Sequence, residues 1–215
     1  MNKTNLPIID IFETALNPIK NYNQAIEQIL NIKNTDVFDY QLNEFFENDE
    51  IIKKWKEEFN FELSQNMKNY QESYPDYDKD KLNEEIMKKG KIIPCGQYLF
   101  HGGLLNLEKN CEKILEKPFA TTISPGNALF HSTIGSKAYD EGKIELLVLK
   151  VDNIKTKAIA LFFTSFSHER EVLFASGIKL SCTEKNEKIG HFRVKNADGT
   201  LEKDVPVDVI ICNIL

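Results

Sequence analysis

The amino-acid sequence predicts an α+β fold, with a helical N-terminal region over residues 1–89 and a strand-rich region over residues 90–215. Before residue 90, apolar residues such as Ala25, Ile26 and Ile29 recur at the spacing of one helix face. After it, short apolar runs follow one another and are separated by Gly, Pro, Asn and Asp. Helices that come first and strands that come later indicate α+β, because a parallel α/β sheet needs alternating segments.

The helical region contains signals for where its segments begin and end. Asn17 followed by Pro18 is a favoured helix start, with Asn as the N-cap and Pro in the first turn. Apolar residues at helical spacing continue from there through Ile32. The other expected segments are helical residues 38–46 and 51–61, a turn over residues 74–78, and a charged helix over residues 80–89 that Gly90 ends.

The strand-rich region is expected to include two helices. One covers residues 105–115, and the other begins at Ser124-Pro125 and ends at Gly142. Residues 196–199, Asn-Ala-Asp-Gly, are typical of a hairpin turn. The expected strands are residues 92–100 (interrupted by Pro94 and Gly96), 119–123, 144–151, 158–163, 171–175, 178–182, 188–195 and 205–214.

Composition excludes several classes of protein. The chain has 215 residues, of which 14 are Phe and 7 are Tyr, so it is not a low-complexity disordered chain. Its apolar runs stay far below the roughly 20 residues of a transmembrane helix, so no membrane partner is expected. The first residues do not form a secretory signal, so a cytoplasmic location is expected. A net charge of -6 argues against a protein that binds nucleic acid by neutralising phosphates.

Cysteine and histidine spacing does not predict a metal site. The four cysteines are Cys95, Cys111, Cys182 and Cys212. They form no Cys-x-x-Cys pair, and the four histidines show neither of the usual zinc-binding spacings. Scattered cysteines are typical of a reducing compartment, where they act as small apolar residues.

The first of three candidate motifs is an apolar strand that ends in Phe100-His101-Gly102-Gly103. Glycines let the backbone approach a ligand, and the N–H and C=O of Gly102 can pair with a planar amide. The imidazole of His101 can hydrogen-bond a ribose hydroxyl. A strand-to-loop turn with an incidental histidine explains the same residues.

The second motif, Phe119-Ala120-Thr121-Thr122-Ile123-Ser124-Pro125, ends a strand and begins a helix. The hydroxyls of Thr121 and Thr122 can orient a neighbouring carboxylate. Both are also ordinary strand residues, and Ser124 is accounted for as a helix N-cap.

The third motif is Glu169-Arg170-Glu171, followed by the apolar residues 172–174. On a strand, residues i and i+2 point to one face, so the two carboxylates are expected side by side. Like charges held together cost energy, and such pairs often mark a binding or acid–base site. The alternative is a solvated strand end, with Arg170 on the opposite face.

Taken in order, the three motifs resemble those of the mono-ADP-ribosyltransferase family of toxin-like enzymes. That family has an aromatic-Arg/His-Gly motif, a Ser-Thr-Ser motif and a Glu-x-Glu motif. Phe100-His101-Gly102, Thr121-Thr122-Ile123 and Glu169-Arg170-Glu171 match them in turn, and the resemblance covers about residues 91–215. The chain departs from any one branch, because it combines a histidine in the first motif with Glu-x-Glu in the third.

The resemblance implies a core of two packed, mainly antiparallel sheets and a reaction with NAD as co-substrate and no metal. Nicotinamide leaves through an oxocarbenium-like transition state, and ADP-ribose passes to an acceptor. Glu171 is implied at the nicotinamide ribose, where its charge stabilises the transition state, and Glu169 is implied to orient or deprotonate the acceptor.

The remaining roles come from the same resemblance. The backbone of Gly102 is implied to hold the nicotinamide amide, His101 to contact an NAD ribose, and Thr121 to orient Glu171. The segment 163–168 is expected to meet the acceptor, with Phe166 exposed. No catalytic residue is expected in the helical region before residue 90.

Three functions stay open. The first is transfer to a protein arginine, which in the family goes with a Glu at the position of Glu169. The second is ADP-ribosylation of RNA or DNA, and the third is an inactive domain that uses the fold for binding. An antitoxin or a target protein stays open as a partner. Only two of the 27 basic residues are arginines, which codon bias or avoidance of self-modification explains.

Overall fold

The structure, a computed structural model, describes residues 6–11, 21–30, 43–152 and 154–215. The expected helix start at Asn17-Pro18 and the apolar positions Ile32, Phe38 and Leu42 lie outside these residues. In the described part, helices come first and strands dominate from residue 91 on, so the predicted α+β class is confirmed.

Side-chain caps begin most of the early helices. Asp49, Ser64 and Asp78 each accept a hydrogen bond from a backbone N–H of the helix that follows. Before residue 90, the helices with described bounds are α1 (Tyr22–Leu30), α3 (Glu50–Glu58), α4 (Gln65–Glu72) and α5 (Lys79–Lys89), and residues 43–48 are also helical. Those after it are α6 (Pro125–Thr133), α7 (Lys137–Glu141) and the 3₁₀ turns η1 (Ile134–Ser136) and η2 (Ser167–Glu169).

The strands form a nine-stranded sheet in the order β1-β6-β7-β4-β2-β5-β9-β8-β3. All neighbours are antiparallel except β5 and β9, which run parallel. The strands are β1 (Lys91–Ile92), β2 (Tyr98–Gly102), β3 (Glu112–Ile114), β4 (Phe119–Thr122), β5 (Ile144–Val151), β6 (Lys157–Ala160), β7 (Glu171–Phe174), β8 (Lys179–Lys195) and β9 (Glu202–Ile214).

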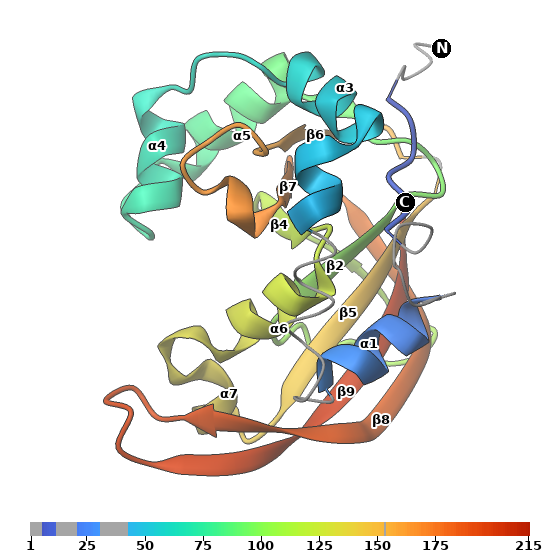
Figure 1. Cartoon of the computed structure of the whole chain (residues 1–215), viewed down its shortest axis with the longest axis vertical. Helices are drawn as coiled ribbons and strands as arrows, with labels where there is room; N and C mark the ends of the chain where they lie inside the picture. Colours follow the sequence, from blue (N-terminus) through green and yellow to red (C-terminus); the bar gives the residue numbers. More distant parts are fainter. Residues whose placement is uncertain (1–5, 12–20, 31–42, 153) are drawn as a thin grey trace.

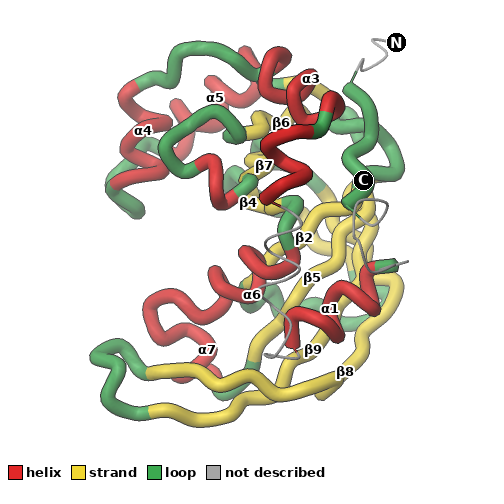
Figure 2. The backbone as a smooth tube through the Cα atoms, viewed as in Figure 1, coloured by secondary structure: helices red, strands yellow, loops and turns green. Residues whose placement is uncertain are grey.

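One narrow junction divides this sheet into two parts. Strands β2 and β4 are joined only at Phe100↔Thr122, whereas β2 and β5 pair over five residues. Helices α3, α4 and α5 lie beside the part with β6, β7 and β4, and α1, α6 and α7 lie beside the part with β2, β5, β9 and β8 (Figures 1 and 2). The two sheets expected from the family resemblance are therefore two parts of one hydrogen-bonded sheet.

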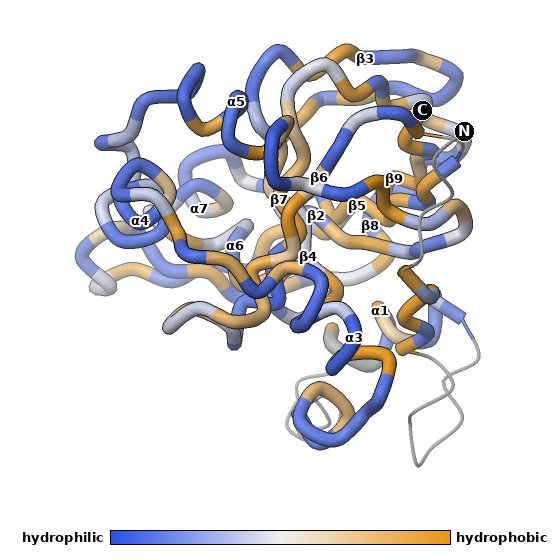
Figure 3. The backbone as a smooth tube through the Cα atoms, turned by 90° about the horizontal axis from the view of Figure 1, so that it is seen from above, coloured by the Kyte–Doolittle hydropathy of each residue, from blue (hydrophilic) through white to orange (hydrophobic). Residues whose placement is uncertain are grey.

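A single core joins the early helices to the sheet. The ring of Trp55 on α3 stacks on Phe162, with 5.8 Å between centroids, and its indole N–H donates to the Pro7 carbonyl at 2.9 Å. Apolar residues gather along the central strands, whereas α4 and α5 are largely hydrophilic (Figure 3). Burial of the Trp55 and Phe162 rings therefore holds α3 against the turn that follows β6.

The expected helix over residues 105–115 is wrong. Asn106 and Asn110 have positive φ angles of 50° and 64°, and residues Glu112–Ile114 form a strand instead. The buried carboxylate of Glu145 on β5 accepts from the backbone N–H groups of Leu105 and Asn106, both at 3.0 Å. Farther along the segment, the N–H groups of Asn110 and Leu115 donate to the carbonyls of Cys182 and Ile178, both at 2.9 Å. These long-range bonds replace the helical ones that the local pattern favours.

Of two smaller expectations, one changes and one is confirmed. The strands predicted over residues 178–182 and 188–195 are one strand, β8, with irregularities in its pairing with β9 around residues 182–190. Gly90 does end α5, and its backbone there is extended, with φ -67° and ψ 163°. A Cβ on Gly90 would lie 2.4 Å from the Ile86 carbonyl oxygen, so close packing is what requires a glycine there.

Candidate active site

The three sequence motifs meet on three neighbouring strands, β7, β4 and β2. Thr122 at the end of β4 pairs with Glu171 on one side and with Phe100 on the other. His101 and Gly102 follow Phe100 directly. Phe100, Thr122 and Glu171 therefore lie side by side on neighbouring strands, at the narrow junction between β2 and β4.

The second motif holds the third motif through its backbone carbonyls. Thr122 Oγ1 donates to the Glu169 carbonyl and Thr121 Oγ1 to the Val172 carbonyl, both at 2.7 Å. Asn127 Nδ2 donates to the His168 carbonyl at 2.7 Å. The remaining bonds are Ile123 N–H to the Arg170 carbonyl at 3.2 Å and Leu161 N–H to the Glu171 carbonyl at 2.9 Å. Every carbonyl from residue 168 to 172 thus has a donor.

This arrangement corrects the role expected for Thr121. Its hydroxyl is bonded to a strand carbonyl, and the register places Thr122, not Thr121, opposite Glu171. The hydroxyl of Thr122 also accepts from the Ser124 N–H at 3.1 Å. The motif positions the backbone that carries the glutamates and does not bond their carboxylates among the described residues.

The two glutamates do not lie on one strand as expected. Glu171 begins β7, but Glu169 ends the 3₁₀ turn η2, and Arg170 between them has a left-handed backbone with φ 50°. The side chain of Arg170 is buried, with its guanidinium 4.6 Å from the centroid of the Phe46 ring and bonded to Asn43. Because Arg170 points into the protein, the solvated strand end does not describe this segment.

Glu171 is the more buried of the two acids. It is 7% exposed, and its carboxylate accepts a hydrogen bond from the hydroxyl of Tyr70 on α4. Burial raises the pKa of Glu171 to about 7, the bond from Tyr70 opposes this rise, and the charge of Glu169 adds to it. A carboxyl group that titrates near neutrality is typical of acid–base and charge-stabilising sites.

Glu169 lies closer to solvent. Its side chain is 30% exposed, and Oε1 lies 3.9 Å from Nε2 of His131 on α6. Burial lowers the pKa of His131, while the charge of Glu169 acts in the opposite direction. The carboxylate of Glu169 is therefore accessible from solvent.

His101 is held as a neutral imidazole. Burial lowers its pKa to about 4, and its Nδ1 lies 2.8 Å from the Ala120 carbonyl oxygen, which requires a proton on Nδ1. The ring also contacts Phe119, with 4.5 Å between centroids. Nε2 therefore carries a lone pair that can accept a hydroxyl proton, although no hydrogen bond joins His101 to either glutamate among the described residues.

Packing is tight at both glycines of the first motif, and at Gly102 the backbone of α6 leaves no room for a side chain. A Cβ on Gly102 would lie 1.7 Å from the Ala128 carbonyl oxygen of α6, and one on Gly103 would lie 2.7 Å from Nε2 of His101. The face of Gly102 on which a side chain would stand is thus filled by α6. Gly103 N–H bonds the Glu145 carbonyl, so strand alternation turns the amide and carbonyl of Gly102 toward β4.

Sequence reasoning missed Tyr70, because helix α4 carries none of the motifs. Its neighbour Gln71 donates to Thr164 Oγ1 at 3.2 Å, so α4 contacts both β7 and the loop before it. In that loop Phe166, expected to be exposed, is half-buried. In the sequence, Tyr70 and Gln71 at the end of a helix look like ordinary surface residues, so no pattern indicates their contacts.

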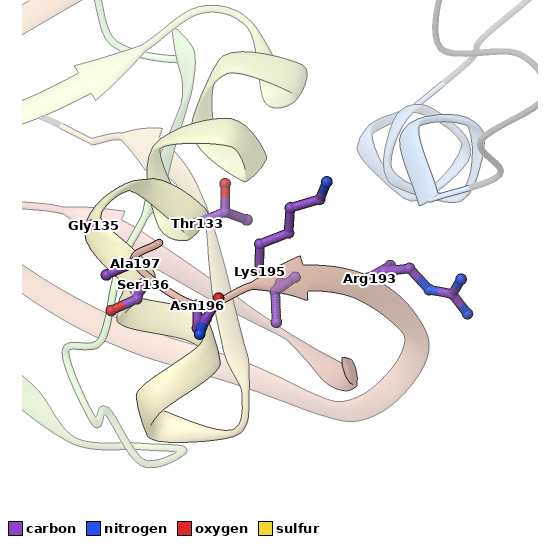
Figure 4. Close-up of a pocket in the computed structure, with 8 residues that line it drawn as sticks. Thr133, Gly135, Ser136, Arg193, Lys195, Asn196 and Ala197 are labelled. Atoms are coloured by element: carbon purple, nitrogen blue, oxygen red, sulfur yellow. The ribbon is translucent and has the colours of Figure 1, made fainter. Parts of the chain in front are cut away.

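A separate pocket of about 380 Å³ lies between the end of α6 and the β8–β9 hairpin. Its lining includes Thr133, Ser136, Arg193 and Lys195, with Arg193 extending away from the hydroxyl groups (Figure 4). No motif residue lines it.

The described residues contain no cluster of His, Cys, Asp or Glu suited to a metal ion, and none of their helices is long and apolar enough to cross a bilayer.

Comparison with known proteins finds solved structures that resemble this chain. No protein-family model matches the sequence, and neither does any curated protein. The solved structures that it resembles include ADP-ribosyltransferases. The structures compared have identities of no more than 17% and TM-scores of no more than 0.44, so they assign no activity to this chain.

Three of these structures cover most of the chain. BECa, an ADP-ribosylating toxin of C. perfringens crystallised with NADH, has 17% identity and a TM-score of 0.44 over 79% of this chain. This chain spans only 49% of BECa. The ADP-ribosyltransferase Vis of Vibrio splendidus, in complex with agmatine, has 14% identity and a TM-score of 0.43, covering 96% of this chain and 90% of Vis. C3stau2 from S. aureus with NAD has 14% identity and a TM-score of 0.41, covering 71% and 73%.

Proposed function

We propose that this chain is a mono-ADP-ribosyltransferase that cleaves NAD at the nicotinamide bond and transfers ADP-ribose to a macromolecular acceptor, with a protein arginine favoured. The observation that carries the proposal is a pair of glutamates that differ in burial, beside the narrow junction of the sheet. Glu171 is buried and bonded to Tyr70, and Glu169 is partly exposed beside it. The first-motif residues lie two strands away.

The chemistry assigns each acid a separate task. As the C1′–N bond breaks, its electron pair leaves with nicotinamide and positive charge develops on the ribose, which the carboxylate of Glu171 stabilises. The acceptor nitrogen then bonds C1′ and loses a proton, which Glu169 is placed to receive. His101 and the backbone of Gly102 are the proposed contacts for the NAD ribose and the nicotinamide amide.

The test is incubation with NAD labelled in its adenylate part and a cell lysate, with Glu171→Gln as the control. Transfer predicts labelled macromolecules with the wild-type chain only. Label that protease removes supports a protein acceptor, and label that nuclease removes supports RNA or DNA. Unlabelled lysate together with intact NAD would overturn the proposal and favour a binding domain.

A further inference from the structure

We propose that Tyr70 is a positioning residue for Glu171, whose carboxylate it orients and whose ionised form it favours by hydrogen-bond donation. This inference rests on the proposed function for its catalytic consequence. It assigns a task in the site to the helical region before residue 90, where none was expected.

The contact is built by a well-anchored helix. Ser64 caps α4 by accepting from the Met67 N–H at 3.1 Å, and the Met67 side chain is fully buried. The Tyr70 ring packs edge-on against Tyr77, with 5.1 Å between centroids. Gln71 ties the same helix to Thr164 in the loop that leads to η2. These contacts hold the Tyr70 hydroxyl at Glu171. They come from a helix that precedes all three motifs in the sequence.

The surroundings of Glu171 make this donor necessary. A buried carboxylate without a partner is strongly disfavoured in its ionised form. The hydroxyls of Thr121 and Thr122 are bonded to backbone carbonyls, so they do not supply it. Among the described residues, Tyr70 is the side chain that donates to this carboxylate.

The charged and titratable groups that face Glu171 offer no other compensation. They are Tyr70 from α4, Tyr77 from the turn after it, and Glu169 from η2. Glu169 repels the charge of Glu171, and Tyr77 is an uncharged phenol at neutral pH. Burial and the neighbouring acids raise the pKa of Tyr70 well above its usual range, so its hydroxyl keeps the proton that it donates.

The decisive measurement is the titration of the Glu171 carboxylate by NMR in protein labelled with ¹³C at glutamate side chains. The signal is assigned by its absence in Glu171→Gln. In Tyr70→Phe, the midpoint is expected about one pH unit higher than in the wild type, because the donor to the charged form is gone. Tyr74→Phe is the matched control, since Tyr74 is 71% exposed and contacts Tyr77 but not Glu171.

A second variant covers the case in which Tyr70→Phe does not fold. Replacing Tyr70 with 3-fluorotyrosine keeps the ring shape and makes the hydroxyl a stronger donor, so the Glu171 midpoint is expected to fall. An unchanged midpoint in a folded Tyr70→Phe or in the fluorinated protein would overturn the proposal, because packing alone would then explain Tyr70.

The catalytic consequence is measured in the same proteins as the pH dependence of NAD hydrolysis. The acid limb is expected to move upward in Tyr70→Phe, with about a tenfold loss of rate on that limb for a shift of one unit. A shifted titration without any NAD hydrolysis in the wild type would refute the proposed function and leave the Tyr70–Glu171 coupling standing. A shifted titration with an unmoved acid limb would refute the positioning role.

Discussion

Glu171 and Glu169 have the same side chain, but their surroundings give them different chemistry. Glu171 is enclosed by Tyr70 and the strand end, and Glu169 is partly open and close to His131. An enclosed carboxylate acts strongly on charge that develops beside it, because little water screens the interaction. An open one can meet a large acceptor. The predicted division of tasks follows from this difference.

Glu171→Gln is expected to reduce both NAD hydrolysis and ADP-ribose transfer by at least about tenfold, which is about 1.4 kcal/mol of transition-state stabilisation. The amide keeps the size of the side chain but loses the charge that stabilises the ribose. Both rates are measured on protein whose thermal unfolding matches the wild type. A folded variant that retains more than about a tenth of either rate contradicts the assignment.

The pH dependence of NAD hydrolysis is expected to show an acid limb near pH 7. Glu171 has a pKa of about 7, so it becomes neutral as the pH falls below that value and no longer stabilises positive charge. His101, with a pKa of about 4, stays neutral across this limb and does not shape it. Rates measured from pH 5 to pH 9 test this, and a flat profile would show that Glu171 is not the limiting group.

Glu169→Gln is expected to reduce transfer much more than NAD hydrolysis. Transfer needs an acceptor nitrogen that is held and relieved of a proton, whereas water needs less positioning. Both activities are compared on one preparation, beside Glu171→Gln. Equal losses would mean that the two carboxylates act as one unit at the ribose, and unchanged rates would remove Glu169 from the mechanism.

At the scale of elements, α6 connects the first motif to the third. Its backbone lies against Gly102, and Asn127 in its first turns bonds the His168 carbonyl. Ser124 caps the helix by accepting from the Asn127 N–H at 3.2 Å. The helix therefore keeps β2 and the segment that carries Glu169 in fixed positions.

Gly102→Ala is expected to lower the free energy of unfolding by roughly 1–3 kcal/mol, because the new methyl group overlaps the α6 backbone. It is also expected to weaken NAD binding as β2 and α6 move apart. Gly142→Ala is the comparison, since Gly142 has open space around it and only its positive φ of 72° opposes a side chain. Denaturant unfolding of both variants tests this; a Gly102→Ala protein as stable as the wild type would contradict the packing.

At the scale of the whole molecule, the helical region forms part of the candidate site. Helix α4 reaches β7 through Tyr70 and the loop before η2 through Gln71. The buried side chains of the early helices and of the strands belong to one core. The division at residues 89 and 90 stays a prediction about the chain's organisation, and truncation at that point would remove the donor to Glu171.

The two arginines of the chain give a whole-molecule prediction for self-modification. Arg170 is buried, and the side chain of Arg193 is 64% exposed. If the acceptor is arginine, self-labelling is expected at Arg193 alone, and Arg193→Lys is expected to abolish it while keeping the charge beside Asp204. Mass spectrometry after incubation with NAD tests this, and label at a lysine or glutamate would argue against arginine as the acceptor.

Features that depend on neighbours in the chain could be predicted from local sequence patterns. The Ser124 cap, the left-handed Gly142 and strand β5 at Ile144–Val151 all follow from local patterns that the structure confirms. The order in which the three motifs follow one another could also be predicted from the sequence. Local patterns succeed there because capping, turn geometry and strand alternation are short-range properties.

Contacts between groups that are distant in the sequence depend on how the elements pack. Residues 105–115 have a helical pattern, but Glu112–Ile114 pair with β8 as a strand, and the N–H groups of Asn110 and Leu115 donate to the carbonyls of Cys182 and Ile178. Thr122, not Thr121, faces Glu171 because register is set by pairing between strands. Tyr70 reaches Glu171 across 101 residues of sequence, and burial at that contact raises the acid's pKa. Sequence spacing carries no record of such contacts, since they arise from packing between elements that no local pattern links.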